Sequence, residues 1–316
     1  MTGEKISTDL KTLVILLFAA LLPGCEDKPS GYDLAADAYR AGNYATALEK
    51  LTPLARAGDA RAQNLLGFMY EFGHGVDQNY GEAAGWYLKA AQQGVAAAQS
   101  RLADLYIKGR GVPVDYWEAM KWSRKAAIQG NAEAEANIGY MYHDGFGVPQ
   151  DYKEAVKWYR KSAEKGWVGA MYDLGVMYQN GRGVERDYAT AIEWYRKAAD
   201  REYPQSQSNL MNMYLEGLGL PKDDTERLAW FLGAAKDRHV TEQYMLGLHY
   251  QRGTGVPKDR IKAYAWLGVA AAGGFEPAQQ RRIDLEASLD DEELEQARAL
   301  AREYWEKYGN KPEARG

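Results

Sequence analysis

The chain has 316 residues, of which 46% are hydrophobic and 26% are charged, and its formal net charge is −5. This composition is typical of a well-packed soluble body. The acidic balance and the lack of a dense basic patch argue against a nucleic-acid-binding protein, and the single cysteine excludes a disulfide inside the chain.

The first 24 residues have the three-part pattern of a signal peptide. Lys5 and Lys11 precede an apolar run over residues 13–22. This run is too short for a transmembrane helix, which needs about 20 residues, but it is typical of a signal-peptide core. The pattern therefore predicts a signal peptide over residues 1–24 and export of the protein.

The leader ends at Cys25 in the letters LPGC, which resemble a bacterial lipobox. In such a motif the cysteine is lipidated and becomes the mature N-terminus, so the resemblance implies a lipidated tether over residues 25–31. Acyl chains would hold the protein on a membrane without a spanning helix. Glu26 at the next position favours the outer membrane, with the rest of the chain facing the periplasm.

From Asp59 to Gly274 one pattern returns six times at a spacing of 36 residues. The predicted repeats are 59–94, 95–130, 131–166, 167–202, 203–238 and 239–274. Tryptophan recurs in register at Trp86, Trp122, Trp158, Trp194, Trp230 and Trp266. A period in this range indicates a solenoid of stacked supersecondary units, whose usual product is an extended binding surface rather than a catalytic pocket.

The third repeat illustrates the predicted unit. Apolar residues at helical spacing predict a first helix near Ala132–His143. The glycines and the proline of residues 145–149 break that helix. Asp151 is a suitable N-cap for a second helix near Tyr152–Lys165. Each repeat is therefore predicted to be a pair of antiparallel helices.

Four of the second helices are predicted to begin with a capping box, in which the N-cap residue and the residue three positions later exchange side-chain to backbone hydrogen bonds. The expected pairs are Asn79/Glu82, Asp115/Glu118, Asp151/Glu154 and Asp223/Glu226. Asp187 and Asp259 keep the N-cap without the acidic partner.

Aromatic and small residues predict how the helices pack. The tryptophans are predicted to fill the core; an aromatic platform for sugars or bases is the alternative, and the strict periodicity argues against it. Glycine is unfavourable inside a helix. Its return at Gly139, Gly175 and Gly247 therefore predicts positions where a neighbouring group leaves no room for a side chain.

The pattern A-x3-L-G-x2-Y-x2-G-x-G-V-x3-D-Y-x2-A-x2-W-Y-x-K-A-A-x2-G resembles the Sel-1-like repeat, a relative of the tetratricopeptide repeat, and residues 170–183 and 187–199 match it almost throughout. The resemblance implies an all-α fold, namely a right-handed α-solenoid of antiparallel helix pairs in a tetratricopeptide-like superhelix. Residues 32–58 are expected to add a degenerate helix pair of tetratricopeptide type. Residues 275–309 should form capping helices that cover the apolar end of the stack, and residues 310–316 a tail.

The fifth repeat departs from the pattern at four positions. Met211 replaces the close-packing glycine, Arg227 replaces an alanine, Arg238 replaces the terminal glycine, and Pro204 interrupts the start. Two explanations are open: drift at a tolerant position, or a local change of solenoid curvature that shapes a binding surface.

The sequence contains no recognisable catalytic or metal-binding motif. Its histidines have no cysteine or acidic partner at metal-ligand spacing, so neither a metal nor another cofactor is expected. Ser162 and Lys165 match the S-x-x-K of penicillin-recognising enzymes, but no K-T-G accompanies them. Cysteine-rich Sel-1-like proteins have been linked to β-lactam hydrolysis, whereas these repeats carry no cysteine. A cell-wall or β-lactam-hydrolysing enzyme is therefore the alternative to a non-enzymatic protein.

In tetratricopeptide arrays the first helix of each pair lines the concave face, so the resemblance places a partner-binding surface on variable first-helix positions. The candidates are Asn64, Phe68, Tyr140, His143, Tyr172, Gln179, Asn212 and Tyr244. Tyr140, Tyr172 and Tyr244 are preferred, because tyrosine is enriched among interface hot spots. Unselected solvent-facing positions would vary between repeats as well.

Together these features predict a membrane-tethered scaffold or adaptor of the bacterial cell envelope. Its expected partners are proteins or peptides, with no nucleic acid and no metal.

Overall fold

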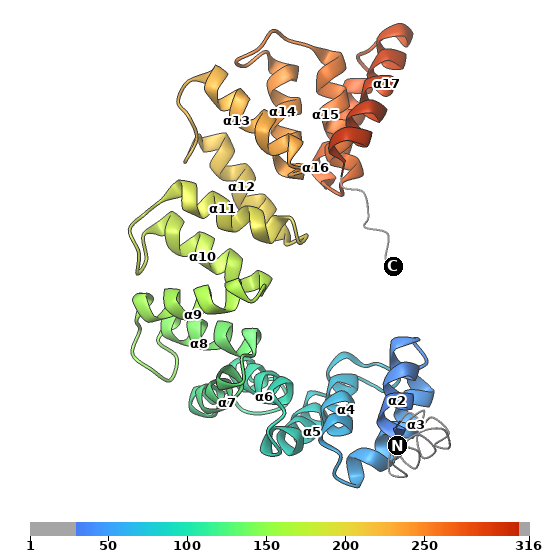
Figure 1. Ribbon diagram of the computed structural model, residues 1–316, viewed down its shortest axis with the longest axis vertical. Helices are drawn as coiled ribbons and strands as arrows, with labels where there is room; N and C mark the ends of the chain where they lie inside the picture. The colour runs from blue at the N-terminus through green and yellow to red at the C-terminus, as the bar shows by residue number, and fades with distance from the viewer. Residues whose placement is uncertain (1–29, 310–316) are drawn as a thin grey trace, which may run out of the picture. The chain divides into compact units, whose positions relative to one another are not determined.

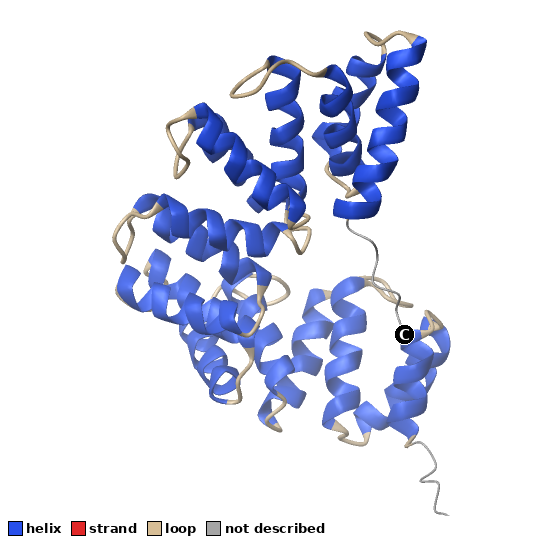
Figure 2. Cartoon of the chain, turned by 45° about the horizontal axis from the view of Figure 1, so that its top comes forward, coloured by secondary structure: helices blue, strands red, loops and turns tan. Residues whose placement is uncertain are grey.

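The computed structural model describes residues 30–309; the predicted leader with Cys25 and the predicted tail lie outside these residues. The described part of the chain consists of sixteen α-helices and has no β-strand. Successive helices pack as antiparallel pairs (Figures 1 and 2), so the predicted all-α solenoid is confirmed. None of the described helices combines the length and the apolar character needed to cross a membrane.

The helices fall into two compact units. The first comprises the described residues up to 98 together with 110–112, and the second comprises 99–109 and 113–309. The first unit contains α2 (Gly31–Arg40), α3 (Tyr44–Arg56), α4 (Ala60–Phe72), α5 (Tyr80–Gln92) and the first residues of α6 (Ala96–Lys108). Leu51, Leu66 and Met69 are fully buried in its core.

The second unit contains the rest of α6 and eleven further helices. These are α7 (Tyr116–Ile128), α8 (Ala132–Asp144), α9 (Tyr152–Glu164), α10 (Val168–Asn180), α11 (Tyr188–Ala199), α12 (Pro204–Glu216), α13 (Asp224–Lys236), α14 (Val240–Arg252), α15 (Arg260–Ala272), α16 (Glu276–Glu286) and α17 (Asp291–Tyr308). The predicted bounds of the third repeat's two helices differ from α8 and α9 by one residue at the C-terminal end.

The recurring helical glycines are required by packing. A Cβ at Gly139 would lie 2.7 Å from the ring of Tyr159, and a Cβ at Gly175 would lie 2.5 Å from the ring of Tyr195. At Gly247 the neighbour is Leu267 instead of an aromatic ring, and an added Cβ would lie 2.8 Å from its side chain. Side-chain contacts this short do not occur, so the predicted steric need is confirmed. In these three pairs the glycine lets a large buried side chain of the second helix lie against the backbone of the first.

The connection between the two helices of a pair also depends on glycine. Gly181 ends α10 in the left-handed conformation, with φ of 66°. Two residues on, Gly183 has φ of 71°, and a Cβ there would lie 2.3 Å from the carbonyl oxygen of Tyr152. The loop after α10 therefore closes onto the start of α9 in the preceding repeat, which explains the repeated Gly-x-Gly.

The N-caps form as predicted, but the capping boxes do not. Asp151 Oδ1 accepts hydrogen bonds from the backbone N–H groups of Lys153 and Glu154, at 2.9 and 3.0 Å. The reciprocal bond is absent because the Asp151 N–H donates to the carbonyl of Tyr142, at 2.9 Å. Asn79 and Asp115 donate in the same way to the tyrosine carbonyl nine residues earlier. None of the four predicted boxes is formed in these helices; the two that form lie at α2 and α17.

The prediction that all six tryptophans fill the core is only partly right. Trp122 and Trp266 are buried, whereas Trp86, Trp158, Trp194 and Trp230 keep some solvent exposure. The deepest position is the next residue, which is Tyr87, Tyr159, Tyr195 and Phe231 in the repeats with a partly exposed tryptophan. Basic side chains cover several of these rings; Lys161, for example, lies 4.3 Å from the ring centroid of Trp158.

The pair α12/α13 of the fifth repeat is more open than its neighbours. The helices of α8/α9, α10/α11 and α14/α15 run close together, whereas α12 packs chiefly on α11 and α14. Met211 and Phe231 occupy the positions where Gly175 and Tyr195 touch one repeat earlier, and two large side chains do not fit that space. Arg227 stands where alanine is fully buried in other repeats, and it lines a cavity of about 330 Å³. The sequence departures thus accompany a local change in helix packing.

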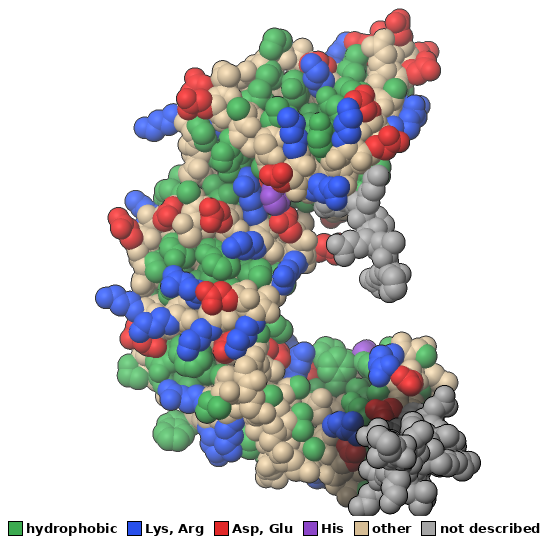
Figure 3. Space-filling view, viewed as in Figure 1, with side chains coloured by type: hydrophobic (Ala, Val, Ile, Leu, Met, Phe, Trp, Pro, Cys, Tyr) green, Lys and Arg blue, Asp and Glu red, His purple; other side chains and the backbone are tan. Residues whose placement is uncertain are grey.

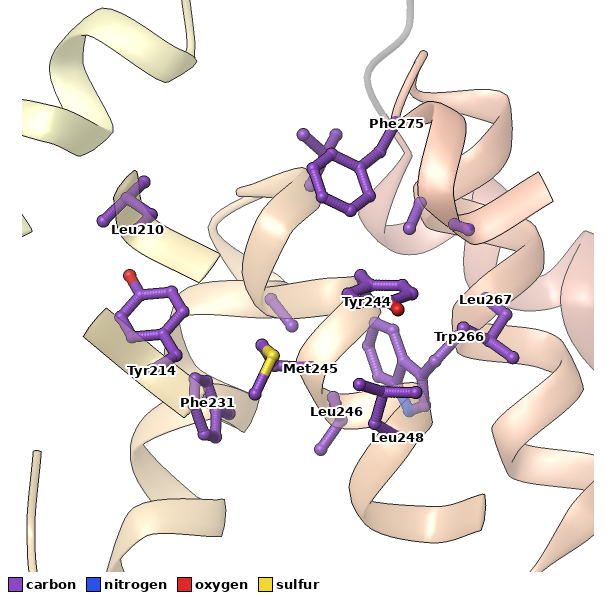
Figure 4. Close-up of a cluster of buried hydrophobic side chains, with 14 of the residues drawn as sticks. Leu210, Tyr214, Phe231, Tyr244, Met245, Leu246, Leu248, Trp266, Leu267 and Phe275 are labelled. Atoms are coloured by element: carbon purple, nitrogen blue, oxygen red, sulfur yellow. The ribbon is translucent and has the colours of Figure 1, made fainter. Parts of the chain in front are cut away.

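The core at the C-terminal end of the second unit is shown in Figure 4. Tyr214, Phe231, Tyr244 and Trp266 pack there with aliphatic side chains from α12 to α15. Helix α15 packs against both α16 and α17, and Leu285 of α16 is buried in the same core. These two last helices therefore cover α15.

Candidate functional site

In the first unit, the candidates Asn64 and Phe68 belong to α4. The ring of Phe68 lies 4.4 Å from that of Phe72 and 6.2 Å from that of Tyr39. The Tyr39 hydroxyl is 2.7 Å from Nδ1 of His74, whose ring is 6.0 Å from Phe68. Asn64 is partly buried, and within the described residues its Oδ1 has no hydrogen-bond partner. Phe68 therefore contributes to an aromatic cluster that ties α2 to α4.

In the second unit, five residues from α8, α10 and the start of α12 lie near one another. We call them the tyrosine–aspartate cluster: Tyr140, Asp144, Tyr172, Asp173 and Tyr203. Tyr140 and Asp144 stand one turn apart on α8, Tyr172 and Asp173 are neighbours on α10, and Tyr203 is the residue before α12. The cluster thus combines side chains from three consecutive repeats.

Neighbouring aromatic rings pack against the tyrosines of this cluster. The ring centroid of Tyr172 lies 5.4 Å from that of Tyr203 and 5.7 Å from that of the buried Tyr195. Tyr140, which is 38% exposed, lies 5.6 Å from Phe146. Because these rings are held by neighbouring rings, they are already placed for contact and lose little freedom on binding.

Asp173 is the unusual charged group of the cluster. Its side chain is partly buried, and within the described residues it forms no hydrogen bond or ion pair. Burial raises the pKa of its carboxyl to about 7, and the nearby carboxylate of Asp144 adds to the rise. An ionised carboxylate in such surroundings is costly without a cation beside it. A cation placed beside Asp173 would therefore stabilise its ionised carboxylate.

Tyr140 and Tyr203 remain neutral donors. Burial, followed by the charge of Asp144, raises the pKa of Tyr140, and a hydrogen bond to Asp144 acts in the same direction. Burial likewise raises the pKa of Tyr203, with Asp173 as the next cause. The cluster accordingly presents aromatic faces, hydroxyl donors and two carboxylates, a combination that suits a lysine or arginine side chain.

Three other predicted residues lie on α8, α10 and α12. His143 Nδ1 is 2.5 Å from the Asp144 carboxylate, and its Nε2 is 3.4 Å from the guanidinium of Arg182. Gln179 accepts a hydrogen bond from the Tyr195 hydroxyl at 2.7 Å, so it supports a buried ring. Asn212 on α12 is exposed.

The prediction for Tyr244 is wrong. Its side chain is only 6% exposed, and its ring packs 5.2 Å from that of Phe275 in the core of Figure 4. The equivalent residue Tyr172 is partly exposed, but Phe275, which follows the sixth repeat, covers Tyr244. Tyr244 therefore offers no surface to a partner.

Asp144, Asp173 and Tyr203 were not predicted from the sequence. A signal for Asp173 exists in the sequence. The equivalent residues of the six repeats form a column that varies as much as the columns of the predicted candidates: Leu65, Arg101, Asn137, Asp173, Asn209 and Met245. What the column cannot show is the lack of a cation near Asp173, because that depends on side chains from other repeats.

The described residues contain no group of three or more histidine, cysteine, aspartate or glutamate side chains placed to hold a metal ion. The two residues of the S-x-x-K match have structural partners. Ser162 donates to the carbonyl of Ala132 at 2.6 Å, and Lys165 pairs with Glu135 at 2.6 Å. Both polar groups therefore tie α9 to the preceding helix.

Charge on the visible face of Figure 3 is mixed, with basic and acidic side chains interspersed. This face therefore has no broad field of one sign, and its charges act through local contacts. A stack of such helix pairs defines a helical-repeat protein.

The comparisons with known proteins identify the family. The Sel1 repeat matches residues 60–95, 96–131, 132–167, 168–203, 204–239 and 243–275, and the chain belongs to this family. A Sel1 repeat protein from Oxalobacter formigenes is 36% identical, with a TM-score of 0.57, and the match covers 77% of this chain and 97% of that one. Sel1 repeat proteins generally mediate protein–protein interactions, and the family is generally a non-enzymatic scaffold.

A second similar structure is a protective antigen of uropathogenic Escherichia coli strains that displays an SLR fold. It is 31% identical, with a TM-score of 0.48, and the match covers 89% of this chain and 69% of that one. No curated protein matches the chain.

Proposed function

We propose that this protein is a non-enzymatic scaffold of the bacterial cell envelope that binds a partner protein through the tyrosine–aspartate cluster. The observation that carries the proposal is Asp173, a partly buried carboxylate among tyrosine rings with no cation beside it. A lysine or arginine of the partner would pair with this carboxylate and lie against the rings of Tyr172 and Tyr203. The family supports the scaffold role.

A direct binding experiment tests the partner chemistry. Two fluorescein-labelled pools of pentapeptides, randomised around a central lysine or a central acetyl-lysine, are titrated with the full chain. Acetylation removes the positive charge and keeps most of the side chain. The lysine pool is expected to bind at least about tenfold more tightly than the acetyl-lysine pool. Equal affinity for the two pools would contradict the assignment.

Matched variants locate the binding surface. The double variant Tyr140→Ala/Asp144→Asn changes two exposed positions of the cluster and should lose most of the binding. The control Trp117→Ala/Glu193→Gln makes the same kinds of change on the second helices α7 and α11, where Trp117 is 76% exposed. The control should bind like the native chain, and a similar loss in both double variants would place the site elsewhere. The same pair of variants can be compared by crosslinking in cells.

The envelope location rests on the leader and on LPGC at Cys25. In this proposal acylated Cys25 holds the repeats at the periplasmic face of the outer membrane. Cys25→Ser should move the protein from the membrane fraction to the soluble fraction in a bacterial host. Retention of the variant in the membrane fraction would show that another part of the chain is responsible.

A further inference from the structure

A cavity lies among the last three helices. This cavity of about 560 Å³ is lined by residues of α15, α16 and α17. Its apolar lining includes Gly268, Ala271, Ala301 and Trp305. A Cβ at Gly268 would meet Ala301 at 3.4 Å, an ordinary contact, so no close packing forces a glycine there as it does at Gly175. The small residues leave room beside the indole, and the volume suits a side chain or a small ligand.

Two arginines of the lining are held in place by one carboxylate. Arg282 of α16 donates to the Tyr264 hydroxyl at 2.7 Å and lies 3.2 Å from Glu286. Arg298 of α17 pairs with the same Glu286 at 2.5 Å. Glu286 therefore orients two guanidinium groups at the cavity and neutralises one of their two charges.

A third arginine is unpaired. Arg302 lies one turn after Arg298 on α17, is exposed, and makes no ion pair or hydrogen bond within the described residues. Glu306 also lines the cavity. Counting the three arginines against Glu286 and Glu306, the site carries a net positive charge, beside an apolar lining.

We propose that this cavity binds the free C-terminal carboxylate of a partner polypeptide whose last side chain is apolar. Guanidinium groups bind carboxylates through paired charge-assisted hydrogen bonds, and the alanines with Trp305 would receive the side chain. A free phosphate would leave the apolar lining uncovered, and an internal peptide segment without an acidic side chain would leave Arg302 unpaired. The site is built from helices other than those of the tyrosine–aspartate cluster, so this inference goes beyond the proposed function.

The test compares two fluorescein-labelled hexapeptide pools that end in leucine, valine or phenylalanine and differ only at the terminus, which is a free acid or an amide. Binding to the full chain is measured by fluorescence polarisation. The acid pool is expected to bind at least about tenfold more tightly, because the amide removes the charge that the arginines meet. Equal affinity of the two pools, or no binding of the acid pool, would overturn the proposal.

Three variants connect the binding to this cavity. Arg302→Gln should weaken binding of the acid pool about tenfold, and Ala272→Trp, at an exposed lining position, should block the cavity without a change of charge. Arg281→Gln is the matched control, because Arg281 is exposed on α16 outside the lining. Full binding by both test variants would refute the assignment.

Competition distinguishes a peptide terminus from other anions. Sodium octanoate and inorganic phosphate are added to the complex with the acid pool. Displacement by either anion at concentrations below those of an unlabelled acid peptide would mean that the occupant is a small acid rather than a polypeptide terminus. Weaker competition by both anions supports the proposal. Circular dichroism of every variant serves as the folding control, so this test does not depend on binding at the tyrosine–aspartate cluster.

Discussion

Replacing Asp173 by asparagine should make the protein more stable at neutral and alkaline pH. The carboxyl has a pKa of about 7 in the folded protein and about 3.9 in an unfolded chain. The folded state thus holds the proton more tightly, so between these values it loses stability as the pH rises. Asparagine has nearly the same shape and does not ionise. The variant should escape this loss.

The size of the effect follows from the two pKa values. Their difference corresponds to about 4 kcal/mol at pH 8 if the whole cost is removed. Asp173 keeps some solvent contact, and water screens part of the penalty, so a gain of about 1–3 kcal/mol is expected. At pH 4 both side chains are neutral and the difference should approach zero.

This gain is measured by urea unfolding, followed by circular dichroism at pH 4, 6 and 8. Hydrogen exchange of α10 gives a local readout. Asp187→Ala is a control of the opposite sense. Hydrogen bonds from Thr190 lower the pKa of Asp187, so that carboxylate stabilises the fold above an unfolded pKa of about 3.9, and its contribution disappears as the pH falls. A gain for Asp173→Asn that is absent at pH 8, or equal at pH 4 and pH 8, would refute the reasoning. If Asp173 also binds a cation, the more stable variant should bind the lysine pool more weakly.

Three further predictions concern the packing. Gly175→Ala should lower the stability by about 1–3 kcal/mol in thermal unfolding, because its Cβ would meet the ring of Tyr195. Gly85→Ala, with open space around it, should raise the stability by about 0.5–1 kcal/mol. Stability changes of the same sign in the two variants would contradict the steric argument. Glu242→Gln should lower the stability by about 3–5 kcal/mol in urea unfolding, because it leaves the partly buried Arg196 without its ion-pair partner. A loss below about 1 kcal/mol would show that the pair is solvated. Tyr244→Ala should cost about 3–5 kcal/mol, but Tyr140→Ala at an exposed position about 1 kcal/mol or less; comparable losses would mean that Tyr140 is also a core residue.

The sequence predicts the helix pairs well because their causes are local. The N-cap at Asp151, the break at Gly145 and the fit of Gly139 against Tyr159 involve residues of one repeat. The same interactions return every 36 residues, so each repeat supports the interpretation of the others. The predicted capping box at Asp151 does not form for a reason that is almost as local. The Tyr142 carbonyl accepts the hydrogen bond from the Asp151 N–H that the box requires.

The candidate site was harder to predict because exposure depends on neighbours beyond one repeat. Tyr140 and Tyr172 were identified from their columns, and both belong to the tyrosine–aspartate cluster. Tyr244 occupies the same column as Tyr172, but Phe275 covers it. Asp173 is notable only because the side chains around it bring no cation, and no column of equivalent residues records that.

The sequence by itself determined the family, the all-helical fold and the register of the repeats, since the spacing of caps, glycines and aromatic residues is a short-range property of the chain. The tertiary structure alone decided which tryptophans keep solvent contact, how the fifth pair opens around Met211 and Phe231, and where an unpaired carboxylate stands among tyrosines. These features arise where helices from different repeats meet, because burial and charge at one position are set by side chains that are distant in the sequence.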